Sequence, residues 1–555
     1  MMFQEKYHQI ERMLRACTGE EDVLLTTGGD HADLASTIAF KLAKKEKRPP
    51  QKIAADIVEK LSKDPELGDV QVETAGPYIN FRFGPSLLGE AVREALEPGY
   101  GKHSRRSVRV ILEHTSANPN GPLHVGHIRN TVIGDTLARA FRKAGYPLEV
   151  QYYLNDMGRQ IAIVSWGFDR LDIPRSEGEK EDHYVARVYV AANREIEKNP
   201  EITKEIDHLM QKVEQGDAET VAKFRRVVSL CAEGIKATLA AMNAHHDRFV
   251  WESDFVRIGD VDRIFERIRR LPQTHEDETL WVDLSERGFE KKYILRRSDG
   301  TSVYSARDLA YHTWKARNYD RMIDVLGADH KLIGAQLQAT LELLGERPPE
   351  IVFFEFVSLP EGSMSTRAGK FVSADELIEE VTSKAYEEVT VRRPELSEEE
   401  RRSIAKSVAI AAIRYDIVKV SPEKSTVFDW KEALDFERQS GPYIQYAHAR
   451  ACSILEKAGE FTPMFTYETE HEVALARHLA RFPAVIEQTV EELRPHLLAN
   501  YARELADLFN AFYHYDPVLK SEGETRNSRL TLVDAVRNTL QESLEILGID
   551  ALRSM

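Results

Sequence analysis

The residues best suited to chemistry are two histidines, His124 and His127, separated by Val125 and Gly126. They stand where an apolar strand pattern gives way to a helix, and a helix N-terminus presents free amides and a positive dipole end to phosphate. Two imidazoles one turn apart can donate hydrogen bonds to phosphate oxygens as negative charge builds during displacement at phosphorus. Gly126 carries no side chain that would keep a nucleotide away. The pattern favours nucleotide chemistry, and the alternatives are histidines that cap the helix or bind a metal ion.

The loop before the helix supplies the residues expected to surround the nucleotide. It is rich in Pro, Gly and Asn and follows directly on the strand, which is where nucleotides bind in parallel-sheet proteins. We predict an ATP-binding motif made of Ala117, Asn118, Pro119, Asn120, Gly121, Pro122, Leu123, His124, Val125, Gly126 and His127.

A β-α-β unit is expected to position this loop. The pattern predicts a strand over 107–113, a helix over about 124–144 and a second strand over 148–154, an order that implies a parallel sheet. A charged, mostly helical stretch from about 167 to 285 carries no obvious chemistry and is predicted to be an insertion. Strand patterns that would complete the sheet of a split nucleotide-binding fold return at Tyr293–Arg297, Met322–Leu326 and Ile351–Phe356.

The two ends of the chain predict further domains. The mixed helix and strand patterns of residues 1–100 predict a small α/β domain. In residues 381–555 apolar positions recur three and four apart, which predicts an α-helical bundle. The nucleotide-binding domain then occupies 101–380, so the predicted fold class is α/β with an inserted helical part and a helical C-terminal domain. In the N-terminal part, helices are expected at 32–44 and 50–61 and strands at 70–74 and 78–83.

Composition narrows the class of protein. A length of 555 residues exceeds what one hydrophobic core supports, so several domains are expected. The formal net charge of -16 argues against a uniformly basic nucleic-acid binder, but Lys and Arg cluster over 41–52 and 102–109, where they could meet RNA or be solvated surface. There is no apolar run of about 18 residues and no secretory leader, so we expect a cytoplasmic protein without a membrane span. The cysteines, Cys17, Cys231 and Cys452, suggest neither a disulfide framework nor a zinc site.

At His124–His127 the sequence resembles the class I aminoacyl-tRNA synthetases, whose HIGH-type signature these residues match. A second signature of that family, the loop that closes over the ATP phosphates, is matched in modified form by Ser363–Arg367, which includes Met364. The stretches 113–118, 298–308 and 363–367 are similar to the arginyl-tRNA synthetase family in particular. The resemblance implies a Rossmann-type class I fold and a two-step reaction, in which ATP activates L-arginine to arginyl-adenylate and the arginyl group passes to the 3′ end of tRNA(Arg). It also implies Mg²⁺ bound with ATP and activation that depends on bound tRNA.

A guanidinium presents five donors in a rigid fork and needs acidic partners, which Glu113 and Asp308 could supply, beside an aromatic wall or hydroxyl from Tyr304. The family resemblance implies that Asn118 faces the amino or carboxylate group of arginine. The arginine-binding residues it implies are Glu113, Ser116, Asn118, Tyr304, Asp308 and His330, the last at a position where many relatives have glutamine.

The resemblance also implies contacts with tRNA at both ends of the chain. The segment 75–83 is similar to the extra N-terminal domain of the family, which implies that Tyr78 stacks on a base of the D-loop and Asn80 hydrogen-bonds to it. The segment 428–450 looks like the anticodon-binding domain, and Tyr446 and Arg450 combine a ring face with a cation. Aromatic residues at such positions are also typical of a helical core. We expect a monomer that binds tRNA(Arg), L-arginine and ATP.

The sequence departs from the family pattern in the phosphate loop. Ser363 stands where the family usually has a lysine, and Gly121 stands where arginyl enzymes without the full loop signature often place a compensating lysine. Arg367 and Lys370 are the candidates to neutralise pyrophosphate, and we place them with Ser365 among the catalytic residues His124, Gly126 and His127.

Two alternatives remain open at this point. One is another class I synthetase or a small-substrate nucleotidyltransferase with the same histidine motif, which the acids Glu113 and Asp308 and the appended domains disfavour. The other is a catalytically inactive paralogue that binds tRNA as a scaffold, which the missing lysine favours and the intact histidine motif disfavours.

Overall fold

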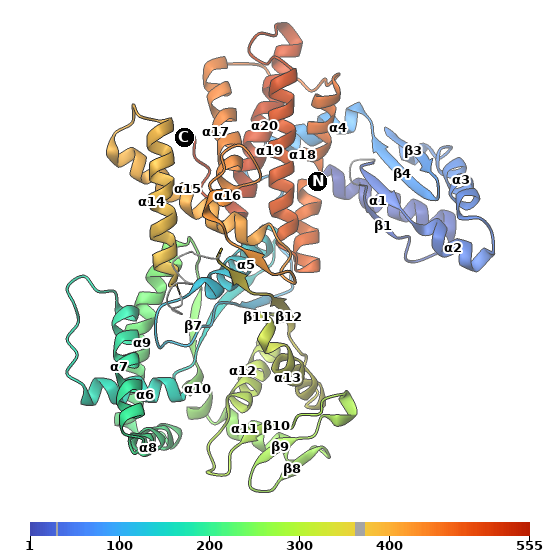
Figure 1. The fold of residues 1–555 in the computed structure, drawn as a ribbon. Coiled ribbons are helices and arrows are strands. Elements are labelled where there is room, and N and C mark those ends of the chain that lie inside the picture. Colours follow the sequence, from blue (N-terminus) through green and yellow to red (C-terminus); the bar gives the residue numbers. More distant parts are fainter. Residues whose placement is uncertain (29–31, 361–371) are drawn as a thin grey trace. The chain divides into compact units, whose positions relative to one another are not determined.

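The computed structural model describes residues 1–28, 32–360 and 372–555 (Figure 1). The described residues form two compact units. The first unit comprises 1–103, 435–492 and 497–555, and the second comprises 104–434 and 493–496. The domain boundaries expected near residues 100 and 380 stay predictions.

The N-terminal part of the first unit is an antiparallel sheet with helices, drawn in blue in Figure 1. Its strand order is β1-β2-β4-β3, with β1 at Leu25–Thr27, β2 at Leu34–Ser36, β3 at Val70–Ala75 and β4 at Tyr78–Phe83. The helix expected over 32–44 is wrong in its first turns, because residues 34–36 pair with β4 and the helix starts only at residue 38. The helices are α1 (Met2–Thr18), α2 (Ile38–Glu46), α3 (Pro50–Leu61), the short 3-10 helix η1 (Pro65–Leu67) and α4 (Pro85–Ala95).

The rest of the first unit is helical. Its elements are α17 (Gly441–Ala458), α18 (Glu470–Glu492), α19 (His496–Tyr515) and α20 (Gly523–Leu547). Apolar residues at helical spacing, such as Leu475 and Leu479 of α18 and Leu540 and Leu544 of α20, are fully buried. Helix α4 packs against α18 and α20, so the N-terminal residues and the C-terminal helices share one core.

The second unit is built on a five-stranded parallel sheet of order β12-β11-β5-β6-β7. Helix α5 (Val125–Lys143) connects β5 (Val110–Glu113) to β6 (Leu148–Leu154), which confirms the predicted β-α-β unit. The remaining strands of this sheet are β7 (Arg248–Trp251), β11 (Arg321–Gly327) and β12 (Glu350–Phe354).

Two expectations about this sheet are wrong. Strand β7 lies inside the stretch 167–285, so part of that stretch belongs to the sheet. The strand at 293–296, β10, does not join the parallel sheet. It pairs antiparallel with β9 (Leu280–Val282), which pairs in turn with β8 (Thr274–Glu276). Short apolar runs such as these do not show which sheet a strand joins, because that depends on partners far away in the chain.

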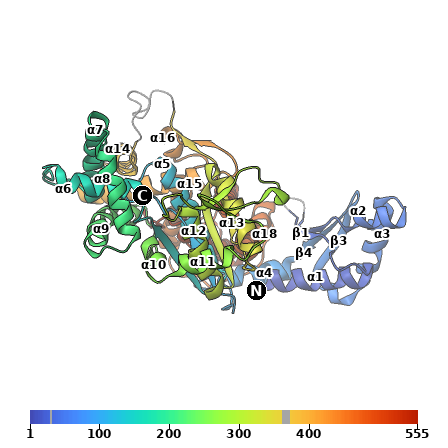
Figure 2. The ribbon, with the colours of Figure 1, turned by 90° about the horizontal axis from the view of Figure 1, so that it is seen from below.

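Helix α5 packs on the sheet of the second unit, and most of the other helices up to residue 343 form two groups. Four of them, α6 to α9, lie together in both Figure 1 and Figure 2, and α7 contacts α6 and α9. These four are α6 (Arg159–Arg170), α7 (Glu181–Lys198), α8 (Ile202–Glu214) and α9 (Ala218–Ala241). The elements around the small sheet are α10 (Glu252–Arg257), α11 (Asp260–Ile268), the 3-10 helix η2 (Ser285–Arg287), α12 (Tyr304–Asn318), the 3-10 helix η3 (Ala328–His330) and α13 (Lys331–Leu343).

The second unit ends in a further helical layer. Arg414 of α15 is fully buried and pairs with Asp135 of α5 at 2.6 Å, which fixes this layer to the helix that follows the histidine motif. Its elements are β13 (Val357–Ser358), α14 (Ala374–Arg392), α15 (Glu398–Val418), β14 (Thr426–Val427) and α16 (Trp430–Ala433), with β13 and β14 paired in parallel.

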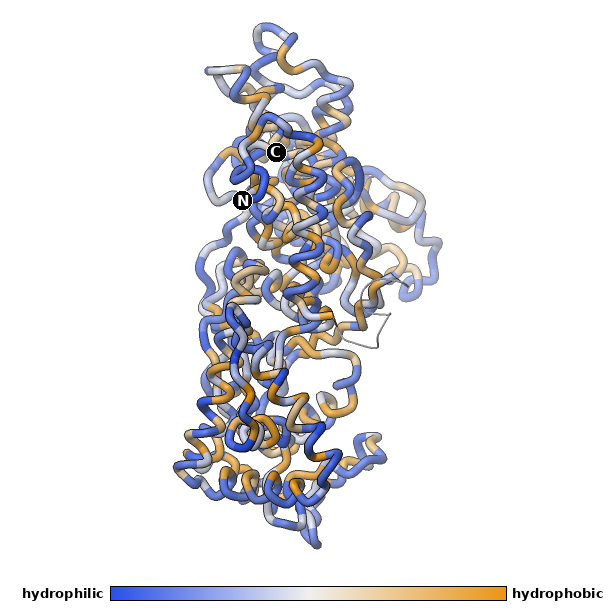
Figure 3. Tube along the Cα trace, turned by 60° about the vertical axis from the view of Figure 1, so that its left-hand side comes forward, coloured by the Kyte–Doolittle hydropathy of each residue, from blue (hydrophilic) through white to orange (hydrophobic). Residues whose placement is uncertain are grey.

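Hydrophobic and hydrophilic residues alternate along the trace in Figure 3. Among the described residues, no helix is long and apolar enough to cross a membrane.

Candidate active site

The two histidines form the start of helix α5. His124 is the N-cap residue, and its Nδ1 accepts a hydrogen bond from the backbone N–H of Gly126 at 3.1 Å. Nδ1 of His127 accepts in turn from the backbone N–H of His124 at 3.2 Å. The rings stack with their centroids 3.6 Å apart. This reciprocal pair is a capping box made of imidazoles, so the helix-capping alternative describes part of what these residues do.

The hydrogen bonds determine which ring nitrogens carry protons. Burial lowers the pKa of His127 to about 3 and also lowers the pKa of His124, so both rings are neutral near pH 7. A neutral imidazole has one N–H, and Nδ1 is an acceptor in both rings. The proton therefore sits on Nε2 of each residue.

Gly126 has a local structural role. A Cβ at this position would lie 2.9 Å from Cε1 of His124, closer than side chains tolerate. Its lack of a side chain therefore makes room for the His124 ring in the capping box. The predicted role, close approach of a nucleotide, stays a prediction.

Both histidines line a cavity of about 840 Å³, the histidine cavity. Six residues of the predicted ATP-binding motif line it: Ala117, Asn118, His124, Val125, Gly126 and His127. The other five described motif residues lie outside this lining: Pro119, Asn120, Gly121, Pro122 and Leu123. Leu123 instead accepts a hydrogen bond at its carbonyl from the backbone N–H of Ala374, at the start of α14. The phosphate-loop candidates Met364, Ser365, Arg367 and Lys370 lie outside the described residues.

A second cavity, of about 440 Å³, adjoins the first. We call it the acidic cavity, and Ser116, Asn118, Leu326 and His330 line both. The six residues predicted to bind arginine all line the acidic cavity: Glu113, Ser116, Asn118, Tyr304, Asp308 and His330. They come from the end of β5 and the loop after it, from α12 and from η3, so the fold gathers residues up to 217 positions apart in the chain.

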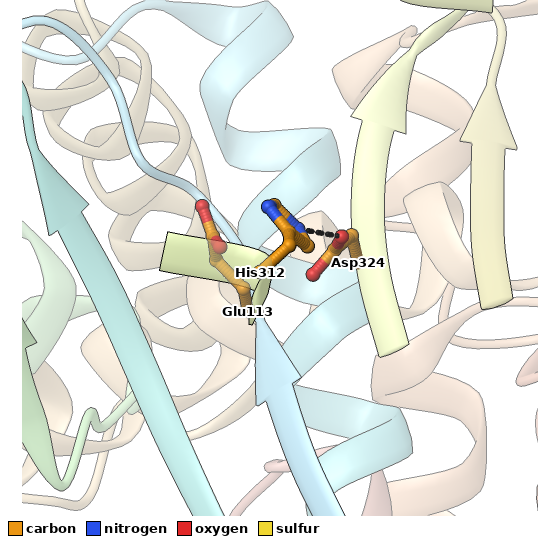
Figure 4. A group of neighbouring side chains, drawn as sticks. All are labelled: Glu113, His312 and Asp324. Atoms are coloured by element: carbon orange, nitrogen blue, oxygen red, sulfur yellow. Dashed lines mark hydrogen bonds and ion pairs between the residues drawn. The ribbon is translucent and has the colours of Figure 1, made fainter. Parts of the chain in front are cut away.

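Glu113, which lines the acidic cavity, belongs to a cluster of paired charges whose other members do not line it. Nζ of the buried Lys315 lies 2.5 Å from Oε2 of Glu113 and 2.8 Å from Oδ1 of Asp324. Asp324 also pairs with His312 at 2.8 Å, and Figure 4 shows these two side chains beside Glu113. Oε1 of Glu113 accepts a hydrogen bond from Ser116 at 2.9 Å. Glu113, His312 and Asp324 have the residue types of a metal site, but the Lys315 ammonium already bridges the two carboxylates.

Unlike Glu113, Asp308 has a carboxylate that is unpaired in the described chain. Among the described residues, its carboxylate has no hydrogen-bond or ion-pair partner, although it lines the acidic cavity. Burial raises the pKa of Asp308 to about 6. Asp308 is half-buried, and a carboxylate in this state favours a cationic ligand, because the ligand supplies the charge partner that the protein lacks.

Two lining residues of the acidic cavity that carry an unpartnered polar atom in the described chain, Glu252 and Tyr153, were not predicted. Glu252, directly after β7, is buried and pairs through Oε1 with Nε of Arg307 at 2.8 Å, while its Oε2 has no partner among the described residues. Burial raises the pKa of Glu252 to about 7. The buried hydroxyl of Tyr153, in β6, also lacks a partner within the described part of the chain. An acid directly after the strand-like run 248–251 was the signal for Glu252, but that run was not assigned to the sheet.

Arg129, two residues after His127, was also not singled out. Its side chain is buried, and it donates hydrogen bonds to the backbone carbonyls of Glu355 at 2.8 Å and Phe356 at 3.1 Å. It also donates to three carbonyls of the segment 421–424. One guanidinium thus ties α5 to the segments that carry β13 and β14.

The residues predicted to contact tRNA lie in the first unit. Tyr78 is 45% exposed, whereas Asn80 is only 6% exposed within the sheet. Tyr446 is 40% exposed, and the Arg450 guanidinium lies 4.9 Å from the centre of its ring. Nη1 of Arg450 also donates to Oδ1 of Asn510 at 2.5 Å. Other aromatic side chains of these helices are core residues: Tyr443, His448, Phe509 and Phe512.

Comparison with known proteins covers almost the whole chain. A family model described as tRNA synthetases class I (R), catalytic domain, matches residues 92–430. The model of the arginyl tRNA synthetase N terminal domain matches residues 7–83, and that of the DALR anticodon binding domain matches residues 444–555.

Individual relatives agree with the family models. The chain is 68% identical to an arginine–tRNA ligase of Methanoregula boonei, over 98% of this chain and 99% of the relative. It is 64% identical to an arginine–tRNA ligase of Methanosphaerula palustris, over 100% of both. The solved structure of Thermus thermophilus arginyl-tRNA synthetase is 32% identical, matches 100% of each chain and superposes with a TM-score of 0.88. The predicted class I fold, with its parallel sheet, small N-terminal part and helical C-terminal part, is confirmed.

Proposed function

The chain belongs to the arginyl-tRNA synthetase family, and from that premise we propose how its residues carry out the family reaction. The enzyme activates L-arginine with ATP and transfers the arginyl group to tRNA. In the first step the arginine carboxylate attacks the α-phosphate of ATP, which forms arginyl-adenylate and releases pyrophosphate. In the second step the terminal ribose hydroxyl of tRNA takes the arginyl group and releases AMP.

The acidic cavity holds the arginine side chain. The observation that carries this assignment is the unpartnered Asp308 carboxylate, which would pair with the guanidinium in a site screened from water. Oε2 of Glu252 and the hydroxyl of Tyr153 supply two further positions for guanidinium N–H groups. Glu113 contributes chiefly as a fixed wall, because Lys315 and Ser116 already occupy its oxygens. The arginine site is completed by four further lining residues: Tyr304, Ser116, Asn118 and His330.

The histidine cavity holds ATP. The Nε2–H groups of His124 and His127 donate to phosphate oxygens, together with the amides at the start of α5, and these donors match the charge that develops on the α-phosphate. Mg²⁺ enters bound to ATP and offsets the charge of its phosphates. Ser365, Arg367 and Lys370 are proposed to contact the β- and γ-phosphates, with Arg367 or Lys370 in place of the usual lysine.

The first unit is proposed to bind tRNA(Arg). Tyr78 and Asn80 would meet the D-loop, and Tyr446 and Arg450 would meet the anticodon region, where exposed rings beside a guanidinium suit unstacked bases. For Asn80, which is nearly buried, contact with a base requires local rearrangement of the sheet. We further propose that the enzyme is a cytoplasmic monomer and that its activation step requires bound tRNA.

A charging assay tests the assignment. Purified enzyme is incubated with total tRNA and each of the twenty labelled amino acids, with and without ATP and Mg²⁺. Arginine alone is expected to become tRNA-bound, and only when ATP and Mg²⁺ are present. Tight tRNA binding without any charging would instead indicate a scaffold protein, and charging with another amino acid would refute the assignment of the acidic cavity.

A further inference from the structure

Two consecutive residues between the cavities have an unusual backbone conformation. Thr115 has φ of +67° and Ser116 has φ of +37°, and neither is glycine. The left-handed region is disfavoured for side chains with a Cβ and most of all for a β-branched residue such as Thr. Such strain persists only where the surroundings enforce it, and it concentrates at functional sites. The strained pair therefore points to a group that holds it.

The hydroxyl of Thr115 contacts Thr131 at 2.8 Å and His114 at 2.9 Å, and the group that holds its backbone N–H is the side chain of Asn130. It lies in α5 three residues after His127 and is 8% exposed. Its Oδ1 accepts a hydrogen bond from the backbone N–H of Thr115 at 2.8 Å, and its Nδ2 donates to the carbonyl of Val325 at 3.0 Å. Thr115 follows the end of β5 and Val325 lies in β11, two strands that pair in parallel. One side-chain amide thus joins the helix of the histidine motif to both strands at the carboxyl edge of the sheet.

The strained pair determines where Ser116 points. Oγ of Ser116 donates to Oε1 of Glu113 at 2.9 Å and accepts from the backbone N–H of Tyr153 at 3.0 Å. Ser116 lines both cavities, and so does Asn118 two residues later. If Thr115 relaxed to an ordinary strand conformation, the chain direction at Ser116 would change. Ser116 and Asn118 would then no longer line both the arginine site and the ATP site.

We propose that Asn130 is a positioning residue for adenylate formation, which keeps Thr115 and Ser116 left-handed so that the arginine carboxylate and the ATP α-phosphate meet at the shared edge of the two cavities. The proposal rests on the assignment of arginine to the acidic cavity and of ATP to the histidine cavity. Asn130 lines the histidine cavity, but its amide oxygen and nitrogen are bonded to Thr115 and Val325, so we assign its effect to the backbone it holds. Its effect is therefore expected mainly in kcat for activation, because misaligned substrates still bind but react more slowly.

The test uses a suppressor that removes the strain. Asn130→Ala is expected to lower kcat for arginine-dependent pyrophosphate exchange about 10-fold to 100-fold, with a smaller change in the KM for arginine and for ATP. Glycine adopts the left-handed conformation without strain, so adding Thr115→Gly to Asn130→Ala should restore most of kcat. Thr115→Ala is the matched control, because it removes the same hydroxyl but keeps a Cβ, and it should restore nothing. All assays contain tRNA, and thermal unfolding midpoints identify variants that fold poorly.

Each other result has a defined meaning. Equal rescue by Thr115→Gly and Thr115→Ala, or an Asn130→Ala variant that loses stability but keeps kcat, would overturn the proposal. A crystal structure of Asn130→Ala gives a readout independent of activity, since residues 115 and 116 should leave the left-handed region, and their staying there would also overturn it. A wild-type enzyme that fails to charge arginine would refute the proposed function instead, while the crystal structure would still report whether Asn130 holds the strained pair.

Discussion

The acidic cavity is lined by carboxylates in two opposite conditions. Glu113 pairs with Lys315, which also pairs with Asp324. Lys315 and Asp324 do not line the cavity themselves, and we call these three residues the paired wall because they support Glu113. Asp308 and Glu252 line the same cavity, and we call them the unpaired wall: Asp308 has no hydrogen-bond or ion-pair partner in the described chain, and one oxygen of Glu252 has none either. A paired buried charge gives a rigid surface, whereas an unpaired one lowers stability until a ligand of opposite charge arrives. Glu113 is therefore expected to shape the arginine site, whereas Asp308 and Glu252 are expected to attract the arginine side chain.

Breaking the paired wall should have the largest effect. Lys315→Met leaves Glu113 and Asp324 buried without a cation, and the expected loss is about 3 to 5 kcal/mol in the free energy of unfolding. Thermal or urea unfolding followed by circular dichroism measures it. Lys331→Met is the matched control, because Lys331 is 56% exposed in its pair with Glu355 and should change stability by less than about 1 kcal/mol. Equal losses in both variants would contradict the distinction between the walls.

Removing the charge of the unpaired wall should weaken substrate use and leave the fold intact. Asp308→Asn is expected to lower kcat/KM for arginine by about 100-fold to 1000-fold, because the guanidinium loses a desolvated charge partner. The KM for ATP should change little. Asp262→Asn, at an exposed position in α11, is the control for the same chemical change. Arginine titrations of pyrophosphate exchange supply the numbers, and an unchanged KM for arginine would rule out Asp308 as the charge partner.

The unpaired wall should also be sensitive to pH. Burial raises the pKa of Asp308 to about 6, above its usual 3.8, so Asp308 takes up a proton as the pH falls through about 6. Arginine affinity should then fall several-fold between pH 7 and pH 5. Stability without arginine has the opposite sign: the contribution of Asp308 is fully present below pH 3.8 and is lost as the pH rises through about 6. Calorimetric titration and unfolding midpoints across this range should show both trends. Asp308→Asn should reduce both and leave the part that comes from Glu252, whose pKa burial raises to about 7.

The smallest expected effect belongs to Tyr153. Its buried hydroxyl has no partner among the described residues, so Tyr153→Phe should not reduce stability. If the hydroxyl meets the guanidinium, the KM for arginine should rise about 3-fold to 10-fold, which corresponds to one hydrogen bond to a charged group. A variant with unchanged KM and unchanged stability would show that this hydroxyl makes no hydrogen bond to the guanidinium.

Local patterns were enough to predict much of the fold. The order of 108–154 as strand, loop, helix and strand gave the β-α-β unit, because apolar periodicity and a Pro- and Gly-rich turn are local signals. The six arginine-binding residues come from the family resemblance and not from local patterns, and all six line one cavity. The strand at 293–296 was found but assigned to the wrong sheet, and β7 was hidden in a helical stretch, because sheet membership depends on pairing across many residues.

The sequence does not predict which side chains form hydrogen bonds or ion pairs with each other. Nothing in the letters shows that Lys315 satisfies Glu113 while Asp308 stays unpaired, since the lysine lies 202 positions from Glu113 and only seven from Asp308. Asn130 reads as an ordinary polar residue of a helix until its two hydrogen bonds are seen. Whether a buried polar group has a hydrogen-bond partner depends on the packed structure. The sequence alone therefore does not show which of these acids and amides are paired.

The imidazole capping box has a consequence for how the sequence can change over time. Each histidine uses Nδ1 to start the helix, and in the proposed reaction its Nε2–H donates to a phosphate, so one ring would perform two tasks. Asparagine places its amide only where Nδ1 lies, and glutamine reaches only the position of Nε2, so neither replacement preserves both tasks. A mutational path through either position must lose one function before it can recover the other, and drift there should be slow even where the surrounding loop is free to vary.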